Sequence, residues 1–288
     1  MRLAISRRRA RAALGRPASR ALIAVAGGSL LAVALSGTAG SGIAGPLGAG
    51  GKPNYVALGD SYTAGPLIPD QTGSPVGCLR STHSYPFLVS AGAGAAMFTD
   101  VSCQGATTAD MTHSQSVPLG TNPPQDNALS ASTTLSLTDP FGSPCKDYYT
   151  SGGTDRLRAK INAAAPKVAA DLQGIHADAP DARVLLVGYP VILPNSGDGC
   201  WPAVPIAFGD VPYLRGVEKA LNSMLASVAG ANNATFVDTY TASIGHDVCQ
   251  APGTKWVEGL IPTSPAVPFH PNMLGEQEMA RQVLAALG

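Results

Sequence analysis

The sequence predicts an α/β domain in which a mainly parallel sheet is covered by helices on both faces. Short apolar runs at 55–58, 183–190 and 234–238 alternate along the chain with longer helical segments, and that order is typical of strand–helix–strand units. The runs at 55–58 and 183–190 do not alternate with polar residues, and apart from Arg183 at the start of the second run they contain no charged residue. Such runs indicate strands that are buried on both faces, as in parallel sheets.

Four segments between and after these runs are predicted to be helices. Residues 85–96 begin with Pro86 in the first turn, a position that proline favours. Residues 155–176, 211–229 and 271–287 carry apolar residues at spacings of three and four, which gives each helix one apolar face to pack on the sheet.

The region 104–155 does not fit this pattern. It is polar, rich in Ser, Thr, Pro and Gly, and more than fifty residues long. A compact domain rarely carries so long a stretch without regular structure. The region therefore contains a functional loop or has lost a segment.

Composition excludes several classes of protein. Hydrophobic residues make up 45% of the chain and charged residues 13%, so it is neither a disordered solvating chain nor a coiled coil. The net charge of zero averages two unlike regions, because residues 1–50 carry seven Arg and no acid. Residues 51–288 have 12 basic and 19 acidic residues. A net charge of −7 makes this part a poor candidate for binding nucleic acid.

The first fifty residues have the organisation of an export leader. A basic stretch at 1–20 precedes an apolar run at 21–35 and small residues around 37–39, the three parts of a secretory signal peptide. The run has 15 residues, short of the ~20 that span a bilayer; an uncleaved anchor is the alternative. Three consecutive arginines leave a twin-arginine route open. We therefore expect residues 1–50 to be a leader and short linker, 51–288 to be the domain, and the protein to be secreted without a membrane span.

The cysteines agree with export. All five follow residue 50, no two form a C-x-x-C pair, and no His stands at metal-ligand spacing from one, so we expect no zinc or other metal. In an oxidising compartment such thiols usually pair. Neighbours in sequence predict the disulfides Cys78–Cys103 and Cys200–Cys249, each stabilising by ~3–4 kcal/mol. Cys145 is left over.

A serine lies directly after the first predicted strand, in Gly59-Asp60-Ser61. In open α/β sheets, ligands bind beyond the carboxyl ends of the strands. A helix beginning at this turn would direct backbone N–H groups at an anion. The alternative is that Ser61 merely caps that helix.

A nucleophilic serine needs a base, and His270 is the candidate. It lies on the loop before the last helix, between Pro268 and Pro271, so the loop can return to the same sheet edge. The prolines stiffen that loop. The other four histidines are typical of solvated loops and helix ends: His83, His113, His176 and His246.

Three ordered blocks of sequence carry a resemblance to a known family. Residues 55–65 (YVALGDSYTAG) resemble the first block of the SGNH hydrolases, also called the GDSL esterase/lipase family. Residues 103–108 (CQGATT) resemble the second block, and 270–272 (HPN) the last. Residues 68–75 and 139–145 are similar to the secreted actinomycete branch. The similarity covers nearly all of the chain after the leader.

The resemblance implies a three-layer αβα sandwich, flavodoxin-like, that hydrolyses carboxylic esters. By position, Ser61 would be the nucleophile and His270 the general base. The N–H groups of Ser61 and Gly105 would stabilise the oxyanion; for Gly105 the alternative is an ordinary turn glycine. We expect a monomer that acts on a lipid or small ester without a cofactor.

The sequence departs from the family pattern near the histidine. Family members often carry an Asp three residues before it, where this chain has Val267, and no acid lies between Glu258 and His270. Members of the secreted branch can orient the His with a backbone carbonyl instead. We therefore predict a Ser–His dyad, with the carbonyl of Val267 or Pro268 accepting the Nδ1–H bond.

A second departure concerns the third block, a strand ending in Gly-Gly-Asn-Asp whose Asn is the third oxyanion donor. The chain has no such segment, and it also lacks the Cys that usually follows and would pair with Cys145. Both absences predict one internal deletion near Ser136. The alternative is that another asparagine, such as Asn122 or Asn127, takes over.

Three functions follow from these observations. The first is a secreted serine esterase of lipase or phospholipase type. The second is a catalytically impaired homologue that acts as a secreted binding protein, which only the deletion favours. The third is a carbohydrate acetylesterase, although no aromatic stripe indicates sugar stacking and aromatic residues make up only 6% of the chain.

Overall fold

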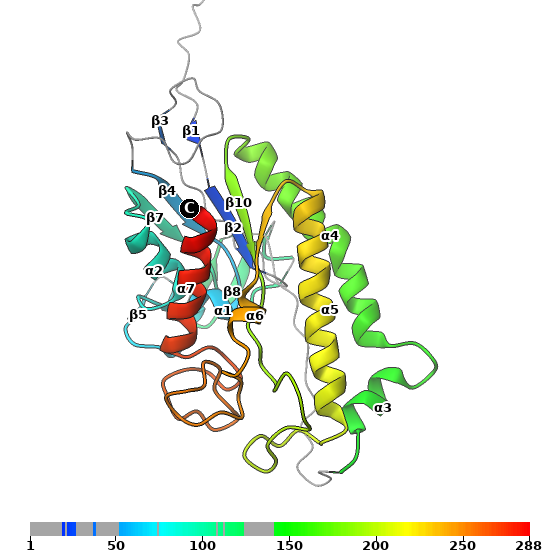
Figure 1. Ribbon diagram of the computed structural model, residues 1–288. Coiled ribbons are helices and arrows are strands. Elements are labelled where there is room, and N and C mark those ends of the chain that lie inside the picture. Colours follow the sequence, from blue (N-terminus) through cyan, green and yellow to red (C-terminus); the bar gives the residue numbers. More distant parts are fainter. Residues whose placement is uncertain are drawn as a thin grey trace, which may run out of the picture.

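The structure is a computed structural model. It describes the backbone at 19–20, 22–26 and 37–38, and backbone and side chains over 52–288 except at 74, 108, 112 and 124–140. Figure 1 shows a central sheet with helices packed on both sides of it.

The sheet has five strands, and each neighbouring pair is parallel. Its spatial order is β11-β10-β2-β4-β7. The strands are β2 (Leu22–Ala26), β4 (Asn54–Ala57), β7 (Met97–Asp100), β10 (Arg183–Val187) and β11 (Thr235–Val237). The predicted α/β class with a mainly parallel sheet is therefore confirmed.

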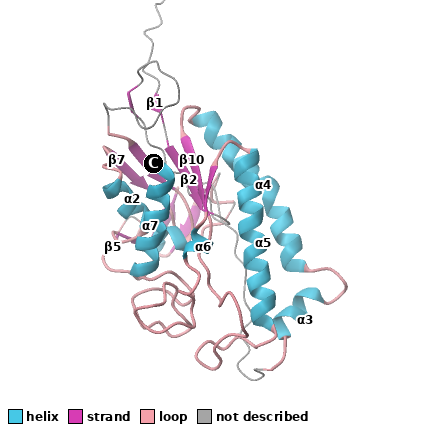
Figure 2. Ribbon diagram, in the orientation of Figure 1, coloured by secondary structure: helices cyan, strands magenta, loops and turns pink. Residues whose placement is uncertain are grey.

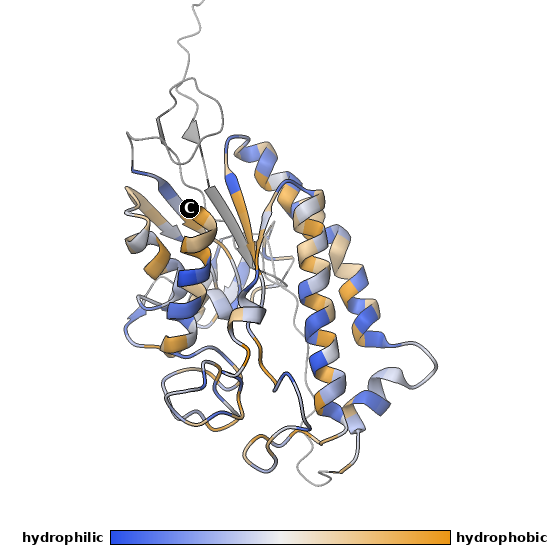
Figure 3. Cartoon of the chain, in the orientation of Figure 1, coloured by the Kyte–Doolittle hydropathy of each residue, from blue (hydrophilic) through white to orange (hydrophobic). Residues whose placement is uncertain are grey.

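Side-chain alternation along β10 divides the core into two layers. Leu185 and Val187 lie in one cluster with residues of α2 (Tyr85–Gly92) and α7 (Met273–Leu287). Their neighbours on the strand lie in the other cluster, with residues of two long helices, α4 (Arg156–Asp178) and α5 (Asp210–Ala231). Because successive residues of a strand point to opposite faces, β10 is apolar along its inner length (Figure 3) and anchors both helix layers.

The strand β2 was not expected in the domain, because the sequence assigns it to the export leader. It pairs with β10 over its whole length, from Arg183↔Leu22 to Val187↔Ala26, and with β4 at Leu22↔Tyr55. Within the described residues, no segment between β7 and β10 joins the sheet. The backbone groups of an inner strand need partners on both of its edges. β2 lies between β4 and β10 and supplies such partners to one edge of each. The leader boundary itself stays a prediction.

The region 104–155 contains more regular structure than its sequence indicates (Figure 2). A hairpin joins β8 (Gln115–Val117) to β9 (Gly120–Asn122), and α3 (Pro144–Thr150) precedes α4. The shorter elements are α1 (Ser61–Ala64), β5 (Gln71–Thr72), η1 (Val76–Cys78), β6 (Arg80–Ser81), α6 (Thr239–Ala242), β1 (Ser19–Arg20) and β3 (Gly37–Thr38).

Both expected disulfides are present. Cys78 is bonded to Cys103 and Cys200 to Cys249. Cys145 lies in neither disulfide, as predicted, and it is buried. Among the described residues, no helix combines the length and apolar character that crossing a membrane requires.

Candidate active site

Ser61 lies at the carboxyl edge of the sheet, where the sequence predicts it. The chain leaves β4 through Gly59, whose φ of 156° brings the backbone close to Thr63. A Cβ there would lie 2.1 Å from Thr63 Oγ1, so only glycine fits this turn. Asp60 then caps α1, with Oδ1 accepting the Tyr62 N–H at 2.8 Å. Ser61 is thus the first residue of α1 and leaves the turn in a fixed direction.

His270 meets Ser61 from the other end of the chain. Its Nε2 lies 2.7 Å from Ser61 Oγ, and its Nδ1 lies 2.9 Å from the carbonyl oxygen of Pro268. A carbonyl can only accept, so Nδ1 carries the proton and Nε2 accepts from the serine hydroxyl. Of the two carbonyls that the sequence offers, the structure uses that of Pro268.

Burial lowers the pKa of His270, although the bond to the Pro268 carbonyl acts in the opposite direction. A lowered pKa keeps the imidazole neutral at pH 7, the form that can accept a proton. Within the described residues, no carboxylate is hydrogen-bonded to the ring.

The loop that carries His270 is held by its backbone. Glu258 N–H donates to the His270 carbonyl at 2.9 Å, and Phe269 N–H donates to the Glu258 carbonyl at 3.0 Å. The Tyr62 hydroxyl donates to the Phe269 carbonyl at 2.5 Å. Because Tyr62 directly follows Ser61, this bond ties the histidine loop to the helix that carries the serine.

Asp60 is the acid nearest to Ser61 in sequence, and it has a structural partner of its own. Its Oδ2 accepts from the Tyr189 hydroxyl at 3.1 Å. Burial raises the pKa of Asp60 to about 6, although hydrogen bonds that include those from the Tyr62 N–H and the Tyr189 hydroxyl act to lower it. Asp60 therefore fixes the turn.

Gly105 lines the same cavity as Ser61 and His270. Its φ of 74° lies in the left-handed region, which favours glycine. Within the described part of the chain, the N–H groups of Ser61 and Gly105 donate to no protein acceptor. Two backbone donors beside the serine are the arrangement that stabilises a tetrahedral oxyanion.

Asn122 does not line the cavity, so the structure does not support it as the third donor. The side chain is fully buried, with Oδ1 accepting from Arg80 at 2.6 Å and Nδ2 donating to the Val101 carbonyl at 3.1 Å. Its side-chain amide instead joins Arg80 to the loop that follows β7. Asn127 and the predicted deletion point at Ser136 lie outside the described residues.

The cavity beside Ser61 has a volume of about 440 Å³. Most of its wall is apolar: Ala106, Leu157, Ile192, Leu193, Ile206, Leu214, Val217, Leu221 and Phe269. Glu218 also lines it, and its Oε1 accepts the Ile192 N–H at 2.9 Å. Burial raises the pKa of Glu218 to about 8, so the side chain is mostly uncharged at pH 7 and the cavity stays apolar.

The other histidines lie outside this cavity. His246 stacks on Trp256, and His176 contacts the Asn232 carbonyl. In the part of the chain that the structure describes, no group of three His, Cys, Asp or Glu side chains is placed to hold a metal ion.

Sequence reasoning missed the residues that fix this site from outside it. Tyr62, Tyr189 and Gln115 hold the histidine loop, Asp60 and the Gly105 loop respectively. For Gln115 a signal exists, because Pro118-Leu119-Gly120 separates two short polar stretches and marks a turn. For the two tyrosines the partners lie far away in sequence, and no local pattern indicates them.

A serine bonded to a neutral histidine, next to two free backbone donors and an apolar cavity at the edge of an α/β sheet, fits a hydrolase of carboxylic esters. Comparison with known proteins agrees. Residues 57–278 match the GDSL-like lipase/acylhydrolase family, and the chain belongs to that family.

Individual relatives come from Streptomyces. The chain is 37% identical to Lipase 2 of Streptomyces coelicolor, over 295 residues that cover 95% of this chain and 99% of that one. Two solved structures share the fold: an extracellular lipase from Streptomyces rimosus (TM-score 0.57, 23% identity, 80% of this chain and 97% of that one) and phospholipase A1 from Streptomyces albidoflavus NA297 (TM-score 0.56, 22% identity, 80% and 96%). They confirm the αβα architecture.

Proposed function

We propose that the chain is an exported serine esterase that hydrolyses acyl esters through a dyad of Ser61 and His270. One observation carries the proposal: Ser61 Oγ lies 2.7 Å from His270 Nε2, while the Pro268 carbonyl holds the other ring nitrogen. This geometry gives the histidine the tautomer that a general base needs.

Hydrolysis would proceed in two halves. Ser61 Oγ attacks the ester carbonyl and passes its proton to His270 Nε2, while the Ser61 and Gly105 N–H groups bind the oxyanion. His270 then gives the proton to the leaving alkoxide, and an acyl-enzyme remains. Water repeats the sequence and releases the carboxylic acid.

The cavity favours an acyl chain over a short polar group. Its wall is lined by leucine, isoleucine and valine side chains, and Glu218 keeps its proton at pH 7. Burial of methylene groups against such a wall is favourable by about 0.8 kcal/mol each. The names of the relatives, lipase and phospholipase A1, agree with an acyl-lipid substrate, whereas nothing in the cavity favours a glycan acetate.

Two observations favour a slow enzyme. The place between β4 and β10 is filled by β2 from the predicted leader, which is what the loss of an internal strand would leave. The alignment to Lipase 2 also spans 295 positions, more than the 288 residues of this chain, so that relative has residues that this chain lacks. If the missing strand carried the third oxyanion donor, turnover falls but the dyad remains.

Export rests on the leader and on one relative. The relatives include a lipase described as extracellular, and the basic, apolar and small-residue parts of residues 1–50 have the order of a signal peptide. Amino-terminal sequencing of the protein from culture medium should find a start after the small residues at 37–39. A start at Met1 would contradict export by cleavage.

The experiment that tests the dyad is turnover of nitrophenyl esters of short and long acyl chains by the purified protein and by Ser61→Ala. We expect the parent to prefer longer chains and Ser61→Ala to lose hydrolysis while its thermal unfolding is unchanged. The matched control is Ser116→Ala, an exposed serine on β8, which should keep the parent rate. A Ser61→Ala rate above a tenth of the parent would remove Ser61 as the nucleophile.

A further inference from the structure

The two backbone donors stabilise an oxyanion only if their N–H bonds point at it. The N–H of Gly105 belongs to the peptide unit whose carbonyl is that of Gln104. A peptide unit is planar and trans, so its C=O and N–H point in opposite directions. Whatever holds the Gln104 carbonyl therefore sets the direction of the Gly105 N–H.

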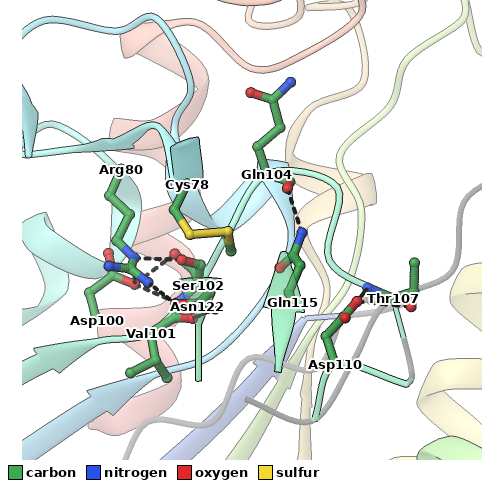
Figure 4. Close-up of a disulfide and its surroundings, with 11 residues drawn as sticks. Cys78, Arg80, Asp100, Val101, Ser102, Gln104, Thr107, Asp110, Gln115 and Asn122 are labelled. Carbon is green, nitrogen blue, oxygen red and sulfur yellow. Dashed lines mark hydrogen bonds and ion pairs between the residues drawn. A yellow bond between two sulfur atoms is a disulfide. The ribbon is translucent and has the colours of Figure 1, made fainter. Parts of the chain in front are cut away.

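A side chain from the β8–β9 hairpin holds that carbonyl. Gln115 Nε2 donates to the Gln104 oxygen at 2.9 Å (Figure 4). The same nitrogen is the nearest atom to the position that a Cβ on Gly105 would occupy, at 3.8 Å. The Gln115 amide thus lies against the peptide unit that joins Gln104 to Gly105, and Gly105 itself lines the cavity.

The other end of the Gln115 amide has no partner within the described residues, although its Oε1 is buried. An unpaired buried acceptor costs free energy, and an apolar side chain of the same length would avoid that cost. An unpaired buried polar group in a native structure calls for an explanation. For Gln115 the explanation is its other amide atom, Nε2, which donates to the Gln104 carbonyl.

The β8–β9 hairpin is itself fixed to the segment between β7 and Gly105. Asn122 is the cross-strand partner of Gln115. It bonds Arg80 and the Val101 carbonyl, and Arg80 Nε donates to the Ser102 carbonyl at 2.5 Å. Figure 4 shows these side chains beside Cys78 and its disulfide.

Backbone hydrogen bonds also hold the two residues that directly precede Gly105. Gln104 N–H donates to the Cys78 carbonyl at 3.0 Å, and Cys103 N–H donates to the Gly59 carbonyl at 2.9 Å. The backbone up to Gln104 is therefore tied at successive peptide units, and the Gly105 N–H is the next group along the chain.

We propose that Gln115 is a positioning residue for ester hydrolysis: its side-chain amide holds the Gln104 carbonyl and thereby directs the Gly105 N–H at the oxyanion. This rests on the proposed function, in which Gly105 is an oxyanion donor. The part of the chain that the structure describes offers two backbone donors beside Ser61, so the direction of each matters more.

The test is Gln115→Met, which keeps the length of the side chain and removes the donor. We expect kcat for a nitrophenyl ester to fall at least 10-fold while KM stays within 2-fold. The inhibition constant of an alkyl boronic acid, which forms a tetrahedral anion on Ser61, should rise by the same factor as kcat falls. The control is Ser116→Met on the same strand, where the side chain is exposed; its kinetics should match the parent.

Thermal unfolding shows whether Gln115→Met folds. If it does not, Gln115→Glu decides, because it has the shape of glutamine and its ionised carboxylate can only accept. The proposal is overturned if a folded Gln115 variant keeps kcat within 2-fold, if Ser116→Met loses as much, or if kcat falls without a change in boronate affinity. Hydrolysis that persists in Ser61→Ala would instead refute the proposed function, whatever Gln115 does.

Discussion

His270 Nδ1 lies 2.9 Å from the backbone carbonyl oxygen of Pro268, so a neutral group orients the imidazole where many serine hydrolases use a carboxylate. A carbonyl fixes the tautomer, but it stabilises the imidazolium less than a carboxylate does. The effect of burial therefore outweighs that of the hydrogen bond to Pro268, and the pKa of His270 is lowered. The consequence is an imidazole that stays neutral into mildly acidic solution, as the proposed role of a base requires.

The pH dependence of kcat/KM should show this. Neutral His270 is the active form, so activity is full above its pKa and falls as the pH drops through it. Because that pKa is lowered from 6.5, we expect the acid limb below pH 6.5. Asp60 has a pKa of about 6 and titrates in the same range. Asp60→Asn separates the two groups: the limb should persist in this variant, and its disappearance would assign it to Asp60.

Replacement of His270 by alanine removes the base and leaves the two backbone donors. We expect kcat/KM to fall by about 10³-fold or more, with unfolding unchanged because the side chain lies at the edge of a cavity. His246→Ala is the matched control, since that ring stacks on Trp256 away from the site. A loss confined to His246→Ala or His83→Ala would redirect the assignment of the base.

Local pattern predicted the fold where a segment decides its own structure. Residues 55–58 are apolar and end at a glycine, and the structure has β4 there. β7 was missed because it is an edge strand whose Met97 is 63% exposed, so no buried run marks it. The helix expected at 85–96 ends at Gly92 because the chain turns at Gly94, with a φ of 61°, to enter β7.

The other features that the sequence did not predict are contacts between distant segments. Nothing in residues 22–26 indicates that they pair with β10, because backbone pairing depends on which place in the sheet is open. The positions of Ser61 and His270 at one edge of the sheet could be predicted, because Ser61 follows a recognisable strand and His270 precedes a recognisable helix. The bond from Gln115 to the Gln104 carbonyl could not, because it depends on where a short polar hairpin packs.

Asn122 should matter for stability. Asn122→Leu takes an acceptor from Arg80 and a donor from the Val101 carbonyl, both in the buried frame of the Gly105 loop. Lost hydrogen bonds to a buried charge and a buried carbonyl should lower the free energy of unfolding by about 2–4 kcal/mol, as measured by urea denaturation. Thr121→Leu, exposed on the same strand, should change it by less than about 0.5 kcal/mol. Equal effects in the two variants would show that Asn122 holds nothing.

Cys145 should titrate as one thiol per chain. It is buried and lies in neither disulfide, whereas the other four cysteines form two disulfides. A thiol reagent should therefore react slowly with the folded, unreduced protein and quickly after denaturation. The measurement is the number of thiols per chain under both conditions. A count of zero after denaturation would mean an intermolecular bridge or another pairing.

The last prediction concerns the place that β2 fills between β4 and β10. Cleavage of the leader would remove β2 and leave backbone groups of both neighbours unpaired, which costs stability. Inserting a strand that ends in Gly-Gly-Asn-Asp, with a following Cys, after Ser136 in residues 51–288 should close the sheet again. We expect a higher unfolding temperature, no thiol titrating at Cys145, and turnover raised by about 10²–10³-fold, the worth of one oxyanion donor (~2.7–4 kcal/mol).

The matched control is the same insertion with alanine in place of its asparagine. It should recover stability and the disulfide without recovering the rate, because only the side-chain amide donates to the oxyanion. KM should change little in either insertion, since the donor acts on the tetrahedral state rather than on the bound ester. If residues 51–288 without any insertion already turn over esters as fast as the intact insertion variant, another group fills the oxyanion site and the deletion argument fails.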